Sequence, residues 1–248
     1  MNHSFVPGTP GVYDAAELKE FVATLPTEEE QQRSMITLLN LQNLSSYVNE
    51  YASAVALHRH VQDLRESVLR TSEPNTLVFN NNMHLLQQWQ SMAGRDAAMT
   101  LFHVGKALLH IKTNMRFTET IKTDSLSENL RKASGELERA FPHYNVARHA
   151  AGHRAEAVGS LEQVKLHAID IDGGQQFIIG NVQGDDYVAS FEKKLLKVPL
   201  TEEARQRLNG VVALIYSAFP KLVHMLPPLN FGGSATEDAD VTSENLSA

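Results

Sequence analysis

The chain has 248 residues, of which 42% are apolar and 21% charged, and this suits one large domain or a domain with a small appendage. It contains no cysteine, which excludes disulfides, thiolate metal sites and a cysteine nucleophile and fits a reducing cytosol. The formal net charge of −7 argues against a broad binding surface for duplex DNA, although it leaves room for a small local phosphate site.

The N-terminal segment lacks the features of a targeting sequence. Residues 1–13 contain two prolines and two glycines and are predicted to form a flexible arm, without a basic n-region or an apolar h-region. No apolar run in the chain approaches the ~20 residues that span a bilayer. We therefore expect a cytoplasmic protein with no membrane partner.

Two long helical regions fill the first half of the chain. A short helix is expected to stop before Pro26, and Thr27 with Glu30 has the pattern of a capping box at the start of the next helix. From there to about residue 70 no Gly or Pro occurs, and apolar residues recur at helical spacing. This stretch predicts one very long helix, or two with a kink near 43–46, of the kind found in bundles.

A second helical region is predicted from about 76 to 115. Trp89 and the methionines are expected in the core, because thioether and indole side chains fill apolar gaps. Gly94 and Gly105 are expected to allow close packing or to form a weak point. His58, in the middle of the first long helix, is expected to be exposed.

The second half of the chain contains shorter helical segments and segments that resemble strands. Turn residues and β-branched runs predict a hairpin and a third strand, placed between shorter helices. Thr201 is the expected N-cap of a closing helix that Pro220 ends. The expected elements are helices over 127–141 and about 143–159, strands over 176–182, 187–191 and 195–198, and a closing helix over about 201–219.

These elements predict a mainly α fold in a single domain over residues 14–228. A long-helix bundle, about 27–158, precedes a small antiparallel β-hairpin or three-strand element and a closing C-terminal helix, about 165–220. The tail 229–248 carries four acidic residues without Lys or Arg and is predicted to be disordered. The hairpin edge or this tail could recruit a protein partner.

The strongest candidate for a chemical site is a group of histidines around one arginine: His143, Arg148, His149 and His153. Small residues, Ala147, Ala150, Ala151 and Gly152, adjoin Arg148 and His149 and lead up to His153, so another backbone or a ligand can come close. His149 and His153 are four apart and share a helix face. Arg148 and His153 are five apart, about 140° around an ideal helix, so they converge only on a distorted helix or across a symmetric dimer.

An arginine and a histidine together suit chemistry at a phosphodiester. The guanidinium fork binds phosphate with two N–H donors and stabilises developing negative charge. A histidine with a near-neutral pKa serves as a general base or acid. This predicts metal-independent transfer on RNA, in which His153 takes the proton of the 2′-OH and Arg148 stabilises the charged phosphorane.

Arg148, the polar His149, three further residues and then His153, late in a helical bundle, resemble the R-x4-H motif of the HEPN superfamily (higher eukaryotes and prokaryotes nucleotide-binding). The resemblance implies a metal-independent ribonuclease or nucleotide-phosphate-binding protein without a cofactor. It implies a homodimer whose two motifs face each other across the interface. It also implies that Arg148 and His153 are catalytic and that His149 positions or assists.

Other interpretations of these residues stay open. Asp96 and Arg95 are candidates to support Arg148 from the second long helix, as is the neighbouring His143, although such acid–base pairs are more often solvated. The motif could also be a basic helix end among small packing residues, or three histidines around a metal, although the H-E-x-x-H zinc pattern is absent. The rival function is a non-catalytic helical scaffold or interaction protein.

Overall fold

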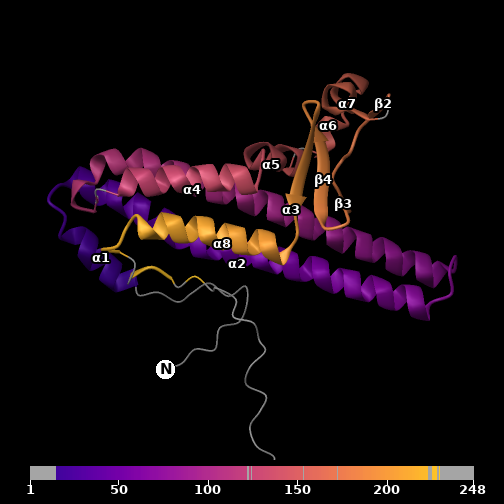
Figure 1. The fold of residues 1–248 in the computed structure, drawn as a ribbon, viewed down its shortest axis with the longest axis horizontal. Coiled ribbons are helices and arrows are strands. Elements are labelled where there is room, and N and C mark those ends of the chain that lie inside the picture. Colours follow the sequence, from indigo (N-terminus) through magenta and orange to yellow (C-terminus); the bar gives the residue numbers. More distant parts are fainter. Residues whose placement is uncertain are drawn as a thin grey trace, which may run out of the picture.

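A computed structural model shows an elongated helical molecule with a small β-element set across it (Figure 1). The structure describes residues 15–121, 123, 125–152, 154–171, 173–222, 225–227 and 229. Helices dominate these residues, which confirms the expected mainly α fold. The expected arm (1–13), the acidic tail beyond Leu229 and His153 lie outside the described residues. None of the helices in the described part combines the length and apolarity needed to cross a membrane.

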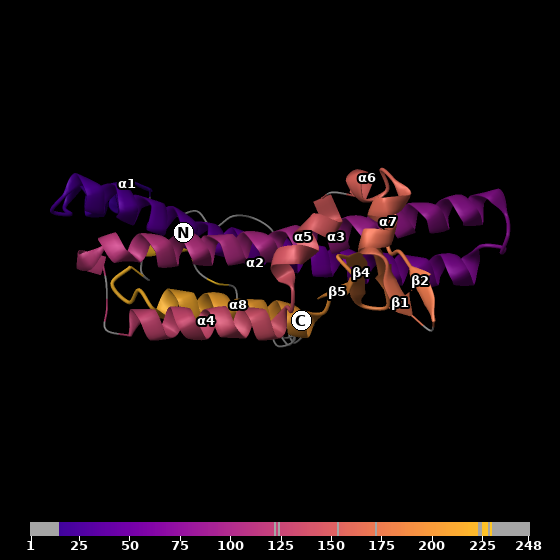
Figure 2. The same ribbon diagram turned by 90° about the horizontal axis from the view of Figure 1, so that it is seen from above.

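Two long antiparallel helices form the spine of the molecule (Figures 1 and 2). After the short α1 (Ala15–Ala23), α2 runs as one continuous helix over Glu28–Thr71, so the alternative of two helices is wrong. Helix α3 follows over Leu77–Asn114, capped by Thr76. The spine begins where the sequence predicts it, because each N-cap threonine accepts a hydrogen bond from a backbone N–H in the first turn.

The capping box at the start of α2 forms only in part. Thr27 Oγ1 accepts from the backbone N–H of Glu30 at 3.1 Å. The Glu30 carboxylate, however, accepts from the backbone N–H of Thr120 at 2.7 Å instead of turning back on its own helix. Thr120 lies in the short 3-10 helix η2 (Glu119–Ile121), which follows η1 (Met115–Phe117) after α3, so this part-buried contact ties the start of α2 to the segment after α3.

Two further helices, α4 (Leu126–Ala140) and α8 (Glu202–Ser217), lie side by side along one half of the α2–α3 pair (Figure 2). The four helices enclose the main core, whose buried side chains include Leu38, Leu41, Leu101, Ile111, Leu130 and Ile215. The other half of the α2–α3 pair extends beyond α4 and α8. Trp89 is therefore only half-buried and Met92 is 52% exposed, contrary to the expected core positions.

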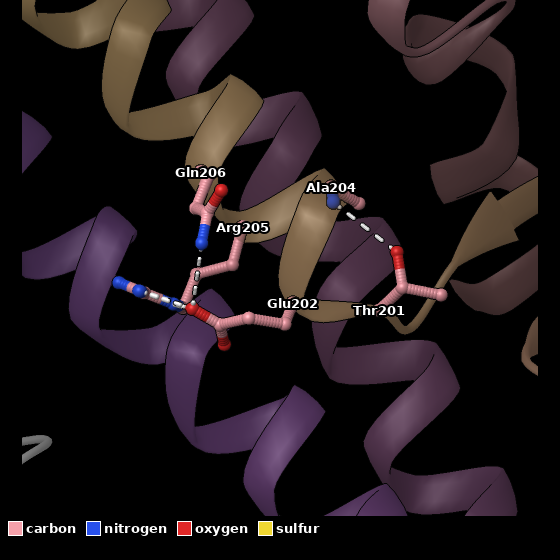
Figure 3. Close-up of polar contacts among 5 residues, drawn as sticks. All are labelled: Thr201, Glu202, Ala204, Arg205 and Gln206. Carbon is pink, nitrogen blue, oxygen red and sulfur yellow. Dashed lines mark hydrogen bonds and ion pairs between the residues drawn. The ribbon is translucent and has the colours of Figure 1, made fainter. Parts of the chain in front are cut away.

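Helix α8 begins with the expected cap (Figure 3). Thr201 Oγ1 accepts from the backbone N–H of Ala204 at 3.2 Å. In the first turn, Arg205 Nε donates to the Glu202 carboxylate at 2.8 Å, and Gln206 donates to it at 3.5 Å. The hydrogen bonds from Arg205 lower the pKa of Glu202, so this acid stays charged at the positive end of the helix dipole.

A small antiparallel sheet packs on α3 beyond the four-helix region. Its order is β3-β4-β5, and a separate pair joins β1 to β2. The bounds are β1 Ile169–Ile171, β2 Gly174–Gln176, β3 Asn181–Gln183, β4 Asp186–Phe191 and β5 Lys194–Pro199. The strands expected over 187–191 and 195–198 are confirmed.

The strand expected over 176–182 is wrong in its middle. Gln176 ends β2 and Asn181 begins β3, while the residues between them form no strand. The left-handed conformation of Gly180 (φ +94°) interrupts the extended chain, and a side chain there would collide with the Tyr187 ring. The bend at Gly180 therefore separates the end of β2 from the start of β3, where a single strand was expected.

Three short helices connect α4 to the sheet: α5 (Tyr144–Gly152), α6 (Arg154–Ala157) and α7 (Leu161–His167). The helix expected over 143–159 is described over Tyr144–Gly152 and Arg154–Ala157, and His153 between them lies outside the described residues. Helix α7 was not expected, although Ser160 gives it an ordinary N-cap by accepting from the N–H of Gln163 at 3.3 Å.

The expected exposure of His58 is also wrong. Its side chain is buried, and its Nε2 lies 3.2 Å from the carboxylate of Asp185, in the turn between β3 and β4. Gln62, one helical turn further along α2, donates to the same carboxylate at 2.9 Å. These two hydrogen bonds, that of Gln62 first, lower the pKa of Asp185. The β-turn that covers His58 is remote in sequence, which is why the helical pattern of α2 alone gives no sign of it.

Candidate functional site

Close packing of α5 on α3 places Arg148. An added Cβ at Gly105 would come within 2.1 Å of the Tyr144 ring, so only glycine allows α5 to approach here. The side of α5 that faces the protein carries small buried alanines, at positions 147, 150 and 151. Small residues on both helices therefore bring the backbone of α5 close to α3 and set Arg148 beside Phe102 of α3, as the expected close-packing role of Gly105 requires.

The guanidinium of Arg148 lies over an aromatic ring instead of pairing with an acid. Its Cζ is 4.5 Å from the centroid of the Phe102 ring. No hydrogen bond or ion pair with a described carboxylate is formed by this half-buried side chain. A cation over an aromatic face is attracted by the ring quadrupole. Stacking of this kind holds the flat guanidinium while its N–H donors stay available.

Two lysines of α3, Lys106 and Lys112, line a cavity together with Phe102, the ring that Arg148 stacks on. Lys106 Nζ lies 5.4 Å from the centroid of the Phe102 ring, and Lys112 Nζ donates to Ser134 Oγ of α4 at 3.2 Å. The cavity has a volume of about 240 Å³ and lies between α3, α4 and α5. Its lining contains no acidic side chain. We call Arg148, Lys106, Lys112 and Phe102 the cationic group.

Tyr144 forms another part of the cavity wall. Burial, and to a smaller extent the carboxylate of Glu138, raises the pKa of its phenol. The hydroxyl therefore stays protonated at neutral pH and can donate a hydrogen bond to an anion in the cavity.

His149 points to a different neighbourhood from Arg148. Its ring stacks on Phe191 of β4, with centroids 5.8 Å apart and an interplanar angle of 19°. Phe191 stacks in turn on His167 of α7 at 4.4 Å, and His167 Nδ1 accepts from the backbone N–H of Glu192 at 3.1 Å. The stack joins α5 to β4 and α7, so it helps to hold α5 in place.

Among the described residues, none of the other predicted site residues forms a hydrogen bond or an ion pair with Arg148. His143 is exposed in the turn before α5, in the left-handed region (φ +62°). Arg95 Nε donates to the backbone carbonyl of Ser91 at 3.1 Å, and no hydrogen bond or ion pair joins Arg95 or Asp96 to Arg148. His153 is not among the described residues, so its position relative to Arg148 stays a prediction.

Asp96 instead belongs to a pair of carboxylates between α2 and α3. Burial raises the pKa of Asp96, against a lowering effect of His103. Burial, and then the charge of Asp96, raises the pKa of Glu50, whose carboxylate accepts from Thr100 Oγ1 at 3.4 Å. Sequence reasoning missed this pair, because the two acids lie on different helices and only the packing brings them together.

The cationic group was also missed as a unit. Phe102 and Lys106 are one helical turn apart, and Gly105 between them marks the close approach of another element. That spacing was a usable signal for a ring with a cation above it. The addition of Arg148 from α5 could not be read from the sequence, because it depends on how the short helix packs.

Among the described residues, no group of three His, Asp or Glu side chains is arranged to hold a metal ion. Comparisons of the chain with protein-family models, with curated proteins and with solved structures find no match.

Proposed function

We propose that this protein is a HEPN-like RNA-binding protein that holds RNA phosphates at the cationic group and cleaves the chain without a metal. The observation that carries the proposal is the guanidinium of Arg148, stacked on Phe102 and without a carboxylate partner among the described residues. Surface arginines commonly pair with a nearby acid, as Arg70 does with Glu66 at 2.8 Å in this chain. An arginine held ready without an acid suits an anionic ligand.

Electrostatics favours an anion at this place. Arg148 and Lys106 lie over one ring, so their charges repel each other, and no acid lines the adjoining cavity. A bound phosphate relieves this repulsion and accepts two parallel hydrogen bonds from the guanidinium. The aromatic ring adds an apolar surface on which a base can stack.

The R-x4-H motif implies the following cleavage of RNA. A base removes the proton of the ribose 2′-OH, the 2′-oxygen attacks phosphorus, and the bond to the 5′-oxygen breaks as that oxygen takes up a proton. The products are a 2′,3′-cyclic phosphate and a 5′-hydroxyl. Arg148 stabilises the extra negative charge on the phosphorus oxygens. The resemblance assigns the role of base to His153.

Salt dependence of binding to a short single-stranded RNA of mixed sequence tests the phosphate contact. Arg148→Met removes the charge and keeps an unbranched side chain over Phe102. We expect it to weaken affinity about tenfold, because hydrogen bonds to charged groups contribute about 1.5–3 kcal/mol. The slope of log K against log salt should fall by about 0.7 for the lost contact. Lys106→Met should act in the same direction.

The matched control is Arg70→Met. Arg70 lies at the far end of α2, carries the same charge and is paired with Glu66. Affinity and salt slope should stay at the wild-type values in this variant. Equal losses in Arg70→Met and Arg148→Met would mean that binding depends only on net charge, and would refute the site.

The proposed assembly is the homodimer that the resemblance implies. Sedimentation equilibrium of the full chain measures it directly, and a mass of twice 27.5 kDa is expected. A monomer that binds and cleaves RNA would show that one copy of the motif is sufficient and would refute the dimeric arrangement.

A further inference from the structure

A large hollow on the described part of the chain lies away from the cationic group. It is a cleft of about 710 Å³ between the N-terminal half of α3 and the segment 177–183 that leads into and includes β3. A second hollow of about 400 Å³ adjoins it and shares His84, Gln87 and Asn181. Clefts that hold small molecules measure roughly 300–1,000 Å³, so this one has room for a ligand of the size of a nucleotide.

One wall of the cleft is fixed in place before any ligand arrives. The buried Ser190 of β4 accepts from the backbone N–H of Ile178 through its hydroxyl at 2.9 Å. Its own backbone N–H donates to the carbonyl of Ile178 at 2.9 Å. Gly180 packs against the ring of the buried Tyr187. A wall that is already ordered loses little conformational entropy when a ligand binds.

The polar part of the lining consists largely of carboxamides: Gln87 and Gln88 on α3, and Asn181 and Gln183 on β3. A carboxamide carries a donor and an acceptor side by side, and those of Gln87 and Gln183 make no side-chain hydrogen bond in the described protein. Asn181 Oδ1 accepts from the N–H of Val182 at 2.8 Å and Gln88 Nε2 lies 2.9 Å from His84 Nε2, so Asn181 offers its donor and Gln88 its acceptor. Nucleobase edges present the same alternation, which is why Asn and Gln recognise bases with paired hydrogen bonds. Phe177 and Met92 add apolar lining against which a base can lie.

The charged side chains that line the cleft and the adjoining hollow are basic. Arg95 lies in its wall, and its Nε bond to the carbonyl of Ser91 fixes the guanidinium while its terminal N–H groups keep no partner in the described protein. Arg65 lies in the wall of the adjoining hollow. Neither hollow is lined by a carboxylate. The cleft therefore combines neutral hydrogen-bonding edges with a phosphate-binding group at one side.

We propose that this cleft binds one nucleotide, with the base against the carboxamides and Phe177 and the phosphate on Arg95. The inference rests on the proposed function only for the class of ligand. Arg95 and Phe102 are seven residues apart on α3, so they share a face and lie about 10 Å apart along the helix axis. The cleft is then a second nucleotide site along the path of an RNA strand that starts at the cationic group.

Methyl NMR of the full chain tests the cleft with AMP, GMP, CMP and UMP as separate probes. The methyl groups of Met92, Ile178 and Ile179 lie in its lining and serve as reporters. We expect their resonances to shift in a saturable way with at least one mononucleotide. Arg95→Met should weaken that binding about tenfold, as the loss of a charge-assisted contact does. Gln88→Leu, at an exposed position, is the second variant and should also weaken it.

Two controls separate this inference from the proposed function. Arg148→Met and Arg70→Met should leave the mononucleotide affinity of the cleft unchanged, because neither side chain lines it. If mononucleotides shift the cleft resonances but Arg148→Met leaves RNA affinity unchanged, the role of the cationic group is refuted and that of the cleft is supported. No shift at about 10 mM nucleotide, far above a useful dissociation constant, would overturn the cleft. Equal affinity for inorganic phosphate alone would overturn the base contact as well.

Discussion

Replacing Gly94 by alanine should destabilise the protein, although the same change usually stabilises a helix. Alanine is favoured over glycine by about 1 kcal/mol in a helix interior. At Gly94, however, the new Cβ would lie 2.4 Å from Tyr187 Cδ2 and 2.7 Å from Tyr187 Cβ. Tyr187 is 1% exposed, and its Cβ is fixed to the backbone of β4, so it cannot move aside alone. Overpacking costs typically about 1–3 kcal/mol, and contacts this short place it at the upper end.

The expected net loss for Gly94→Ala is therefore about 2 kcal/mol, the overpacking of about 3 less the propensity gain of about 1. Gly135→Ala in α4 is the matched control, because nothing lies within 4 Å of its added Cβ. It should gain up to about 1 kcal/mol. Urea unfolding followed by circular dichroism measures both. If Gly94→Ala were as stable as Gly135→Ala, the seating of the sheet on α3 described above would be refuted.

Three further substitutions test electrostatics and capping by the same urea measurement. Glu50→Gln should stabilise the protein near neutral pH by about 0.5 kcal/mol or less, given solvent screening. The pKa of Glu50 is raised by burial and by Asp96, so the folded state holds the proton more tightly and its stability falls as pH rises above the ordinary carboxyl value. The gain should vanish near about pH 4, and a gain that persists there would contradict this cause. Thr201→Ala should cost about 1 kcal/mol through loss of the N-cap, and an unchanged midpoint would show that the cap contributes nothing. Glu30→Ala should cost about 1.5–3 kcal/mol because it removes a part-buried hydrogen bond from the N–H of Thr120 to a charged carboxylate, and a loss equal to that of Thr201→Ala or smaller would contradict this contribution.

The sequence predicts the helices well because their signals are local. The N-cap threonines at positions 27 and 201 are where the pattern places them, and α2, α3, α4 and α8 begin and end within a residue or two of expectation. The positions of β4 and β5 are also predicted correctly, because the two strands and the turn that joins them are adjacent in sequence. Gly94 and Gly105 hold the expected close-packing positions, and the structure supplies their partners, Tyr187 and Tyr144.

The remaining features depend on contacts between distant segments. His58 is buried because a turn more than a hundred residues later covers it, as the bond to Asp185 shows. Met92 is exposed because α4 and α8 cover only the other half of the α2–α3 pair. The apolar periodicity of α3 does not reveal where that cover ends. Arg148 was found from a short motif, yet its partner Phe102 was not, since a cation over a ring requires knowledge of how α5 packs on α3.

The most direct test of the central claim is cleavage of a mixed RNA pool in EDTA by the wild type, Arg148→Met, His153→Ala and Arg70→Met. We expect products with 2′,3′-cyclic phosphate ends from the wild type and Arg70→Met, and their loss in the other two variants. Cleavage that survives Arg148→Met would contradict the role of the guanidinium stacked on Phe102. No cleavage by the wild type at high protein concentration would contradict the catalytic part of the proposal and favour a non-catalytic interaction protein.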